Sequence, residues 1–544
     1  MKNKTHLIKT VLLLFILVGL SNSMMGQQAN EPMATGLFEP TWKSLEQYKV
    51  PEWFQNAKFG IWAHWGPQCQ PEQGDWYARF MYAEGSREYK WSVENYGHPS
   101  EYGFKDVCNA WKAEKWDPEA LVKLYKKAGA RYFFAMANHH DNFDMWDSKY
   151  QPWNAVNIGP KKDIIDGWAK AARINGLYFG TSIHAAHAWR FYETAQGADK
   201  TGPKAGIPYD GKLTKADGKG KWWEGYDPQD LYAQNHPLSE DSENLGSIHR
   251  QWDWNNGVTA PSEKYCNNFY DRTVDLINKY NPDLLYFDDT ALPFWPINDA
   301  GLRIAAHFYN HNMATHKGKQ EGVIFGKILT EDQKKSMIWD VERGAPDKIQ
   351  GIPWQTCTCI GEWHYRRTVY TENRYKSAKT VVHMLADIVS KNGNLLLNIP
   401  VRGDGSIDEK ELKIVEEIGV WMTVNSEGIY DTRPWKIFGE GPSAENANPI
   451  NAQGFNEGKT KYSSKDIRFT TKNGVLYAIV LGWPEDGKIV IKSLSKNNPL
   501  HPDKVNKVEL LGSGKVKFIT GADGLTVTLP ARKTNDMAVV LKIK

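Results

Sequence analysis

Short apolar runs that end in polar residues recur along the middle of the chain. The run at 284–287, Leu-Leu-Tyr-Phe, leads directly into Asp288 and Asp289. A continuous apolar run is typical of a strand buried on both faces, as in a parallel sheet. In a barrel of such strands, residues at the carboxyl end of a strand point into the active site. The pattern therefore predicts that Asp288 lies at a barrel mouth, whereas a lone Asp after a strand could simply cap a helix or begin a turn.

Helical segments separate most of these runs. We predict strands near residues 58–63, 132–137, 177–183, 284–288, 323–325, 337–339 and 394–399, and helices near 117–129, 163–174, 263–280, 298–312, 376–391 and 408–424. This alternation is typical of an α/β fold, either a barrel or a doubly wound sheet. Polar residues gather after the strands rather than before them. This one-sidedness favours a (β/α)8-like TIM barrel over residues 33–433.

Two regions depart from the alternation. Residues 185–260 form a long insertion that contains several tryptophans. A segment of that length inside a compact domain favours a lid or binding loop over a solvated insertion. After residue 433, short β-prone runs follow hairpin turns such as Lys472-Asn473-Gly474. Residues 434–544 are therefore predicted to form a C-terminal antiparallel β-sandwich, in which nothing singles out a site.

The first 26 residues predict a secretory signal peptide. Lysines precede an apolar stretch at residues 11–20 that is too short to span a membrane, and small residues follow it up to Gly26. No cysteine follows the stretch, so no membrane anchor is indicated, and we expect export to the periplasm or the exterior. The five cysteines of the chain lack CxxC spacing. They are expected to be mostly buried and free, with one distant disulfide left open.

Composition bears on the class of ligand. The 544 residues carry a formal net charge of +3, which argues against a nucleic-acid partner. The chain also has 23 tryptophans and 25 tyrosines. Aromatic faces stack on the C–H faces of sugar rings, so this abundance favours a carbohydrate ligand, although large cores also use Trp. The sequence gives no indication of oligomeric state.

Candidate catalytic carboxylates follow several of the predicted strands. A retaining glycosidase holds two carboxyl groups about 5–5.5 Å apart, one as nucleophile and one as proton donor. With Asp288 as the nucleophile, the candidates for the second acid are Glu342, Glu362 and Asp340. Glu342 fits best, because it follows an apolar strand and precedes a glycine turn. A structural salt bridge with Arg343 would equally explain a glutamate at this position, with no role in catalysis.

Histidines follow three of the predicted strands, at His64, at His139-His140 and at His184. Their neutral rings offer donors and acceptors that suit sugar hydroxyls. A metal site is the competing interpretation, but the chain contains neither HxH nor HExxH spacing. Any single histidine of this kind could also be a satisfied core residue.

Several motifs of the chain resemble glycoside hydrolase family 29, the α-L-fucosidases. They are KFGIWAHWG at 58–66, YGFKD at 102–106, HHDNF at 139–143, WDS at 146–148, GNLLLN at 393–398 and GIY at 428–430. The resemblance extends over residues 40–435 in the same order. It implies a (β/α) barrel with a C-terminal β-sandwich, a retaining mechanism, a fucosylated glycan as partner, and no metal or other cofactor.

The resemblance also implies roles for individual residues. Asp288 matches the family's nucleophile, and Glu342 best matches its acid/base. His64, His139 and His140 match ligands of the fucose hydroxyls. His184 or His187 stands in place of an aromatic residue of the active site.

Two further positions depart from the family pattern. Asp75 and Trp76 stand where the family has a Glu-Trp-Tyr motif, with Asp75 one methylene shorter than the usual Glu. Trp354-Gln355 replaces a Trp-Glu pair common in the family, which removes one rival for the acid/base.

We therefore expect an exported, retaining exo-α-L-fucosidase that releases terminal α-L-fucose from glycans through a covalent fucosyl-enzyme. The expected catalytic residues are Asp288 and Glu342, and the expected substrate-binding residues are His64, Asp75, Trp76, His139, His140, His184 and Trp354. Two alternatives stay open: a hydrolase of sulfated fucan or a related 6-deoxysugar polymer, and a fucose-binding protein that has lost catalysis.

Overall fold

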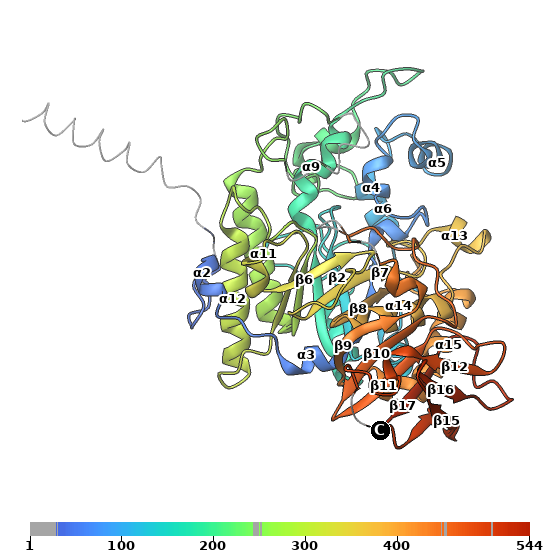
Figure 1. Cartoon of the computed structure of the whole chain (residues 1–544). Helices are drawn as coiled ribbons and strands as arrows, with labels where there is room; N and C mark the ends of the chain where they lie inside the picture. Colours follow the sequence, from blue (N-terminus) through green and yellow to red (C-terminus); the bar gives the residue numbers. More distant parts are fainter. Residues whose placement is uncertain are drawn as a thin grey trace, which may run out of the picture.

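The computed structural model describes residue 29, residues 31–242, residue 250 and residues 253–447, 449–450, 454–501 and 504–544. Figure 1 shows the whole chain. The signal peptide predicted at residues 1–26 lies outside the described residues. Within them, no helix combines the length and apolarity that crossing a membrane requires.

Eight parallel strands close into a barrel in chain order, from β1 to β8, which confirms the predicted fold class (Figure 1). They are β1 (Phe59–Ala63), β2 (Tyr132–Asn138), β3 (Tyr178–Ile183), β4 (Leu284–Phe287), β5 (Val323–Gly326), β6 (Ile338–Glu342), β7 (Trp354–Cys359) and β8 (Gly393–Asn398). Strand β7 was not predicted from the sequence, because Trp-Gln-Thr-Cys-Thr-Cys contains no apolar run. The strand is nevertheless buried along its whole length, between β6 and β8.

Helices cover the outside of most of the barrel, and the six predicted helices are present with ends shifted by at most a few residues. They are α7 (Pro118–Lys127), α8 (Ile164–Ile174), α11 (Glu263–Tyr280), α12 (Ala300–Thr315), α14 (Ala378–Ser390) and α15 (Glu409–Asn425). Side chains that accept from backbone N–H groups begin several of them, for example Asp117, Ser262 and Asp408. No helix lies between β6 and β7, where residues 343–353 run as a loop.

Shorter helices lie before β1, in the loops that connect the barrel strands and, for α16, in the C-terminal domain. They are α2 (Trp42–Leu45), α3 (Glu52–Ala57), α4 (Tyr77–Phe80), α5 (Arg87–Asn95), α6 (Phe104–Ala110), α9 (Ala188–Phe191), α10 (Pro228–Leu231), α13 (Arg367–Thr371) and α16 (Pro442–Glu445).

Large aromatic side chains fill the interior of the barrel. Tyr132, Phe134, Tyr286 and Phe325 are buried and belong to one apolar cluster with Leu396. The barrel is therefore a packed core rather than a pore, as is usual for this architecture. Any ligand must bind at an end of the barrel, above this core.

The chain then forms two antiparallel sheets, which confirms the predicted C-terminal domain. The six-stranded sheet has the order β14-β13-β17-β11-β10-β9, and the three-stranded sheet has the order β12-β16-β15. The strands are β9 (Arg433–Glu440), β10 (Ile467–Lys472), β11 (Val475–Val480), β12 (Lys488–Ile491), β13 (Val508–Leu510), β14 (Gly514–Lys515), β15 (Lys517–Thr520), β16 (Leu525–Thr528) and β17 (Val539–Ile543). A buried ion pair of 2.6 Å between Arg468 on β10 and Asp387 on α14 joins this domain to the barrel.

The five cysteines are all buried and free. The disulfide that the sequence left open is therefore absent from the structure, and the expectation of buried free thiols holds.

The insertion at 185–260 packs against residues 75–110, and its described part lies at the same end of the molecule as α4, α5 and α6 (Figure 1). Its buried Asp210 accepts hydrogen bonds from Tyr82 (2.7 Å) and Tyr232 (2.6 Å) and pairs with Lys105 (2.8 Å). Such a network fixes the insertion to the loop that follows β1. This part of the insertion is therefore anchored to the barrel, and the role of a lid or binding loop stays a prediction.

We expect Asp210→Ala to lower the free energy of unfolding by about 3 kcal/mol, because it removes a buried charge partner and leaves polar groups unsatisfied. Urea unfolding monitored by tryptophan fluorescence measures the change. Asp217→Ala is the matched control, because Asp217 caps an exposed turn of the same insertion. Equal effects of the two substitutions would contradict a structural role for Asp210.

Candidate active site

A pocket of about 210 Å³ opens at the carboxyl ends of the barrel strands. Its walls are Trp62, His64, Asp75, Trp76, His139, His140, His184, Tyr286, Asp288, Lys327, Glu342, Arg343, Trp363 and Phe455. Eight of the nine residues that the sequence singled out line this one pocket, and Trp354 is the exception. The site therefore lies where the barrel architecture places it.

Asp288 directly follows β4 and meets three cationic or hydrogen-bonding groups. One carboxylate oxygen contacts the ammonium of Lys327, and the other lies 3.4 Å from His140 Nε2 and 3.3 Å from His184 Nδ1. Burial alone would raise the pKa of Asp288, but the Lys327 charge and the two histidines hold this pKa well below its usual value. Asp288 is therefore a carboxylate across the physiological pH range.

Glu342 is the last residue of β6, and its Oε2 lies 2.5 Å from the same Lys327 ammonium. Because one nitrogen contacts an oxygen of each acid, those oxygens of Asp288 and Glu342 lie within about 5 Å of each other. Burial alone would lower the pKa of Lys327, but the two carboxylates hold it well above its usual value. The lysine is thus a fixed positive charge between two acids.

Four histidine rings form the wall contributed by β1, β2 and β3. The ring centroids of His64 and His139 are 4.9 Å apart, and each of these rings lies 5.0 Å from that of His184. Gln68 Nε2 lies 2.8 Å from His139 Nδ1, and the carbonyl of His184 lies 3.0 Å from His140 Nδ1. These contacts fix the orientations of the His139 and His140 rings.

Burial keeps most of these rings neutral. It lowers the pKa of His64 and His139 well below the usual value and that of His184 to about 4. Burial also acts to lower the pKa of His140, but the carboxylate of Asp288 raises it overall. Both ring nitrogens of His64 are buried and have no hydrogen-bond partner among the described residues. Such nitrogens suit the hydroxyls of a bound sugar.

Asp75 and Trp76 reach the pocket from the loop after β1. Asp75 Oδ1 lies 2.6 Å from His364 Nδ1 and 3.8 Å from His139 Nε2. Trp76 precedes α4 in a left-handed conformation, with φ of 61°. A non-glycine residue in this conformation is uncommon and is typical of a position that the surrounding structure imposes.

Two groups of side chains have the composition of metal ligands. One ligand atom of each of His64, Asp75, His139 and His364 lies within 4.8 Å of the others, and the same holds for His139, His140 and His184. However, Asp75 and His139 already have the protein partners His364 and Gln68. The absence of a metal, which the family resemblance implies, stays a prediction.

The structure corrects the prediction for Trp354. This residue begins β7 and so lies at the amino end of the barrel, away from the pocket. Its ring is fully buried, and its Nε1 donates to the carbonyl of Lys391 at 2.9 Å. It cannot touch a sugar bound at the carboxyl ends of the strands.

The two rivals of Glu342 also lie outside the pocket lining. Asp340 accepts hydrogen bonds from Gln355 (2.9 Å) and Cys357 (3.0 Å), and burial raises its pKa to about 7. Glu362 pairs with Arg366 at 2.7 Å. His187 lies behind the site, where its Nε2 is 2.6 Å from the carbonyl oxygen of Asp288.

Six residues of the lining were missed: Trp62, Tyr286, Lys327, Arg343, Trp363 and Phe455. Lys327 could have been found, because a lysine directly after an apolar strand is expected at the barrel mouth. Trp363 follows β7 and was lost together with that strand. Phe455 follows β9 and gives no sequence signal that connects it to the barrel.

A family model described as alpha-L-fucosidase matches residues 25–427, and a model of the alpha-L-fucosidase C-terminal domain matches residues 460–544. The chain belongs to the α-L-fucosidases, glycoside hydrolase family 29. It is a glycoside hydrolase, and its substrates are fucosylated glycans.

Individual relatives agree with this assignment. The α-L-fucosidase of Branchiostoma floridae is 26% identical over 92% of this chain and 93% of its own. The tissue α-L-fucosidase of Homo sapiens is 25% identical, with 96% and 92% covered. A crystal structure of Thermotoga maritima α-fucosidase with a mechanism-based inhibitor superposes with a TM-score of 0.67, at 25% identity, and covers 93% of this chain and 99% of that one.

Proposed function

We propose that this fucosidase is a retaining exo-enzyme, with Asp288 as nucleophile and Glu342 as acid/base. The observation that carries the proposal is the shared contact of both carboxylates with Lys327, which holds their oxygens within about 5 Å. Retaining glycosidases have carboxyl groups about 5–5.5 Å apart, whereas inverting enzymes need about 6.5–9.5 Å to fit a water molecule. The spacing of these oxygens is below the range of inverting enzymes, which supports a retaining mechanism.

The reaction then proceeds in two displacements. Asp288 attacks the anomeric carbon, and the bond to the glycosidic oxygen breaks as Glu342, which enters this step in its protonated form, gives that oxygen its proton. Glu342 next takes a proton from water, which attacks the anomeric carbon and releases Asp288. The low pKa of Asp288 serves both steps, because the residue attacks as a carboxylate and leaves as one.

The shape of the pocket supports release of a single terminal sugar. Trp62 and Tyr286 line it directly above the packed core of the barrel, so the pocket is closed below. Its volume of about 210 Å³ is below the roughly 300–1,000 Å³ typical of pockets for larger ligands. Both features fit one sugar ring and not an internal segment of a polymer.

A sulfated fucan as substrate would require cations that are available to sulfate. Among the described lining residues, Lys327 is engaged by two carboxylates, and the Arg343 guanidinium lies 5.3 Å from the centre of the Trp363 ring and donates to Cys359. These contacts favour an unsulfated fucoside. We also propose that the enzyme is exported, on the basis of residues 1–26 alone.

Asp288→Gly should lower kcat for an aryl α-L-fucoside by at least about 10⁴-fold, because no nucleophile remains.

Glu342→Ala should lower kcat about 10²–10⁴-fold on a fucosyl disaccharide, because its leaving oxygen needs a proton. The loss should be much smaller on α-L-fucosyl fluoride, whose leaving group needs little protonation. Glu362→Ala is the matched control and should keep full activity, and a larger loss there than in Glu342→Ala would reverse the assignment.

Lys327→Met should move the acid limb of the kcat/KM profile to higher pH by at least about one unit. Without the ammonium, burial and the nearby Glu342 raise the pKa of Asp288, so the reactive carboxylate is protonated at a higher pH. Lys335→Met is the control, because Lys335 is an exposed residue paired with Asp332. An acid limb that stays in place in Lys327→Met would show that Lys327 does not set the ionisation of the nucleophile.

A further inference from the structure

One residue of the pocket comes from outside the barrel. Phe455 belongs to the stretch between β9 and β10, which are both strands of the C-terminal domain. Its side chain is 48% exposed, an unusual fraction for a large apolar ring beside a catalytic pocket. The ring is thus placed at the pocket mouth without being buried by the protein itself.

The backbone around Phe455 pairs with the backbone that carries Glu342. Gly454 forms a parallel bridge with Glu342, and the N–H of Phe455 donates to the Glu342 carbonyl at 2.8 Å. The N–H of Glu457 donates to the Arg343 carbonyl at 2.9 Å. Residues 454–457, called here the C-terminal segment, therefore lie along the end of β6, where no barrel helix follows the strand.

Side chains of the C-terminal segment strengthen this pairing. The amide of Asn456 bonds both the N–H and the carbonyl of Ala345, each at 3.0 Å. The carboxylate of Glu457 accepts from Thr358 on β7 at 2.5 Å and pairs with Lys376 at 2.7 Å. The segment is thus fixed to two neighbouring strands of the barrel.

The backbone conformation shows how closely the C-terminal segment fits against the end of β6. A Cβ atom on Gly454 would lie 2.2 Å from the Glu342 carbonyl oxygen, and φ of Gly454 is +112°. Phe455 and Arg343, on opposite sides of the pairing, are non-glycine residues with φ of 64° and 46°. Left-handed conformations of this kind cost free energy and are typical of functional sites, where surrounding contacts impose them.

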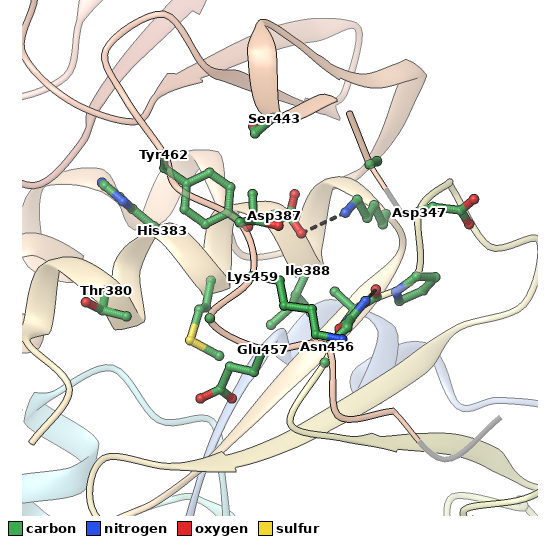
Figure 2. Close-up of a pocket in the computed structure, with 18 of the residues that line it drawn as sticks. Asp347, Thr380, His383, Asp387, Ile388, Ser443, Asn456, Glu457, Lys459 and Tyr462 are labelled. Carbon is green, nitrogen blue, oxygen red and sulfur yellow. Dashed lines mark hydrogen bonds and ion pairs between the residues drawn. The ribbon is translucent and has the colours of Figure 1, made fainter. Parts of the chain in front are cut away.

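The C-terminal segment also separates two cavities. Phe455 lines the catalytic pocket, whereas Asn456, Glu457 and Lys459 line a second cavity of about 410 Å³ between the barrel and the C-terminal domain, with Tyr462 and Asp387 (Figure 2). The backbone pairing with Glu342 therefore places Phe455 at the catalytic pocket.

The order of the strands around the barrel indicates on which side of a bound sugar Phe455 lies. In a closed barrel of eight strands in chain order, β2 and β6 lie opposite each other. His139 and His140 follow β2 and suit the fucose hydroxyls, whereas Glu342 ends β6 and must face the glycosidic oxygen that it protonates. Phe455, bonded to the backbone of Glu342, lies on the same side as that oxygen.

We propose that Phe455 forms the binding site for the leaving group, where the pyranose ring that carries the fucose packs its C–H face against the phenyl ring. This inference rests on the proposed function, because the leaving-group side is defined by Glu342. It gives the C-terminal domain a direct part in substrate recognition. The preferred substrates are accordingly fucosides whose fucose is linked to another sugar.

Two substrates that share fucose and differ in the leaving group test the proposal. An α-L-fucosyl disaccharide places a pyranose at Phe455, whereas α-L-fucosyl fluoride has nothing to stack. Phe455→Ala should lower kcat/KM about tenfold for the disaccharide and change it less than twofold for the fluoride. Phe455→Trp should restore the disaccharide value, because it restores an aromatic face.

The matched control is Trp222→Ala, which removes another exposed aromatic ring, 43% exposed, that does not line the pocket. It should leave both kcat/KM values unchanged. Equal losses on the two substrates in Phe455→Ala, or no loss on either, would overturn the proposal. If the wild-type protein hydrolysed neither substrate, the proposed function itself would fail, so the two failures are distinguishable.

Discussion

The ammonium of Lys327 between the carboxylates of Asp288 and Glu342 is the interaction on which the site depends. Two carboxylates this close would otherwise repel each other, and one of them would take up a proton. Burying charged groups is costly, and it is tolerated only where the geometry is good and further polar contacts are made. The ring nitrogens of His140 and His184 lie 3.4 Å and 3.3 Å from Asp288 Oδ2, and the result is a nucleophile that stays ionised in the pocket.

The barrel makes this arrangement from three consecutive strands. Asp288 follows β4, Lys327 follows β5, and Glu342 ends β6. Neighbouring strands lie about 4.8 Å apart, so side chains at their carboxyl ends meet without any special loop. Loops contribute further residues of the pocket wall. They are Asp75 and Trp76 from the loop after β1, Trp363 from the loop after β7, and Phe455 from the C-terminal domain. The charged groups thus sit at the ends of the barrel strands, and Phe455, which we propose to meet the leaving group, sits on a segment added around them.

The barrel and most of its site could be predicted from the sequence, for identifiable reasons. Continuous apolar runs marked seven strands, and the polar residues after them marked the catalytic face. The eighth strand, β7, is buried but built from Thr, Gln and Cys, and hydrophobic patterning cannot detect such a strand. Without β7, the sequence could not show that Trp354 begins a strand, and this is why a buried residue at the wrong end of the barrel was assigned to the substrate. Phe455 depends on a contact between domains that no local pattern encodes.

The stereochemistry of the first-formed product tests the central claim most directly. Proton NMR during hydrolysis of an aryl α-L-fucoside distinguishes the anomers of free fucose before they interconvert in water. Two displacements at carboxylates held this close predict that α-L-fucose is released first, with the β anomer increasing only later by mutarotation. Initial release of β-L-fucose would mean that water attacks directly, and the covalent role of Asp288 would then be wrong.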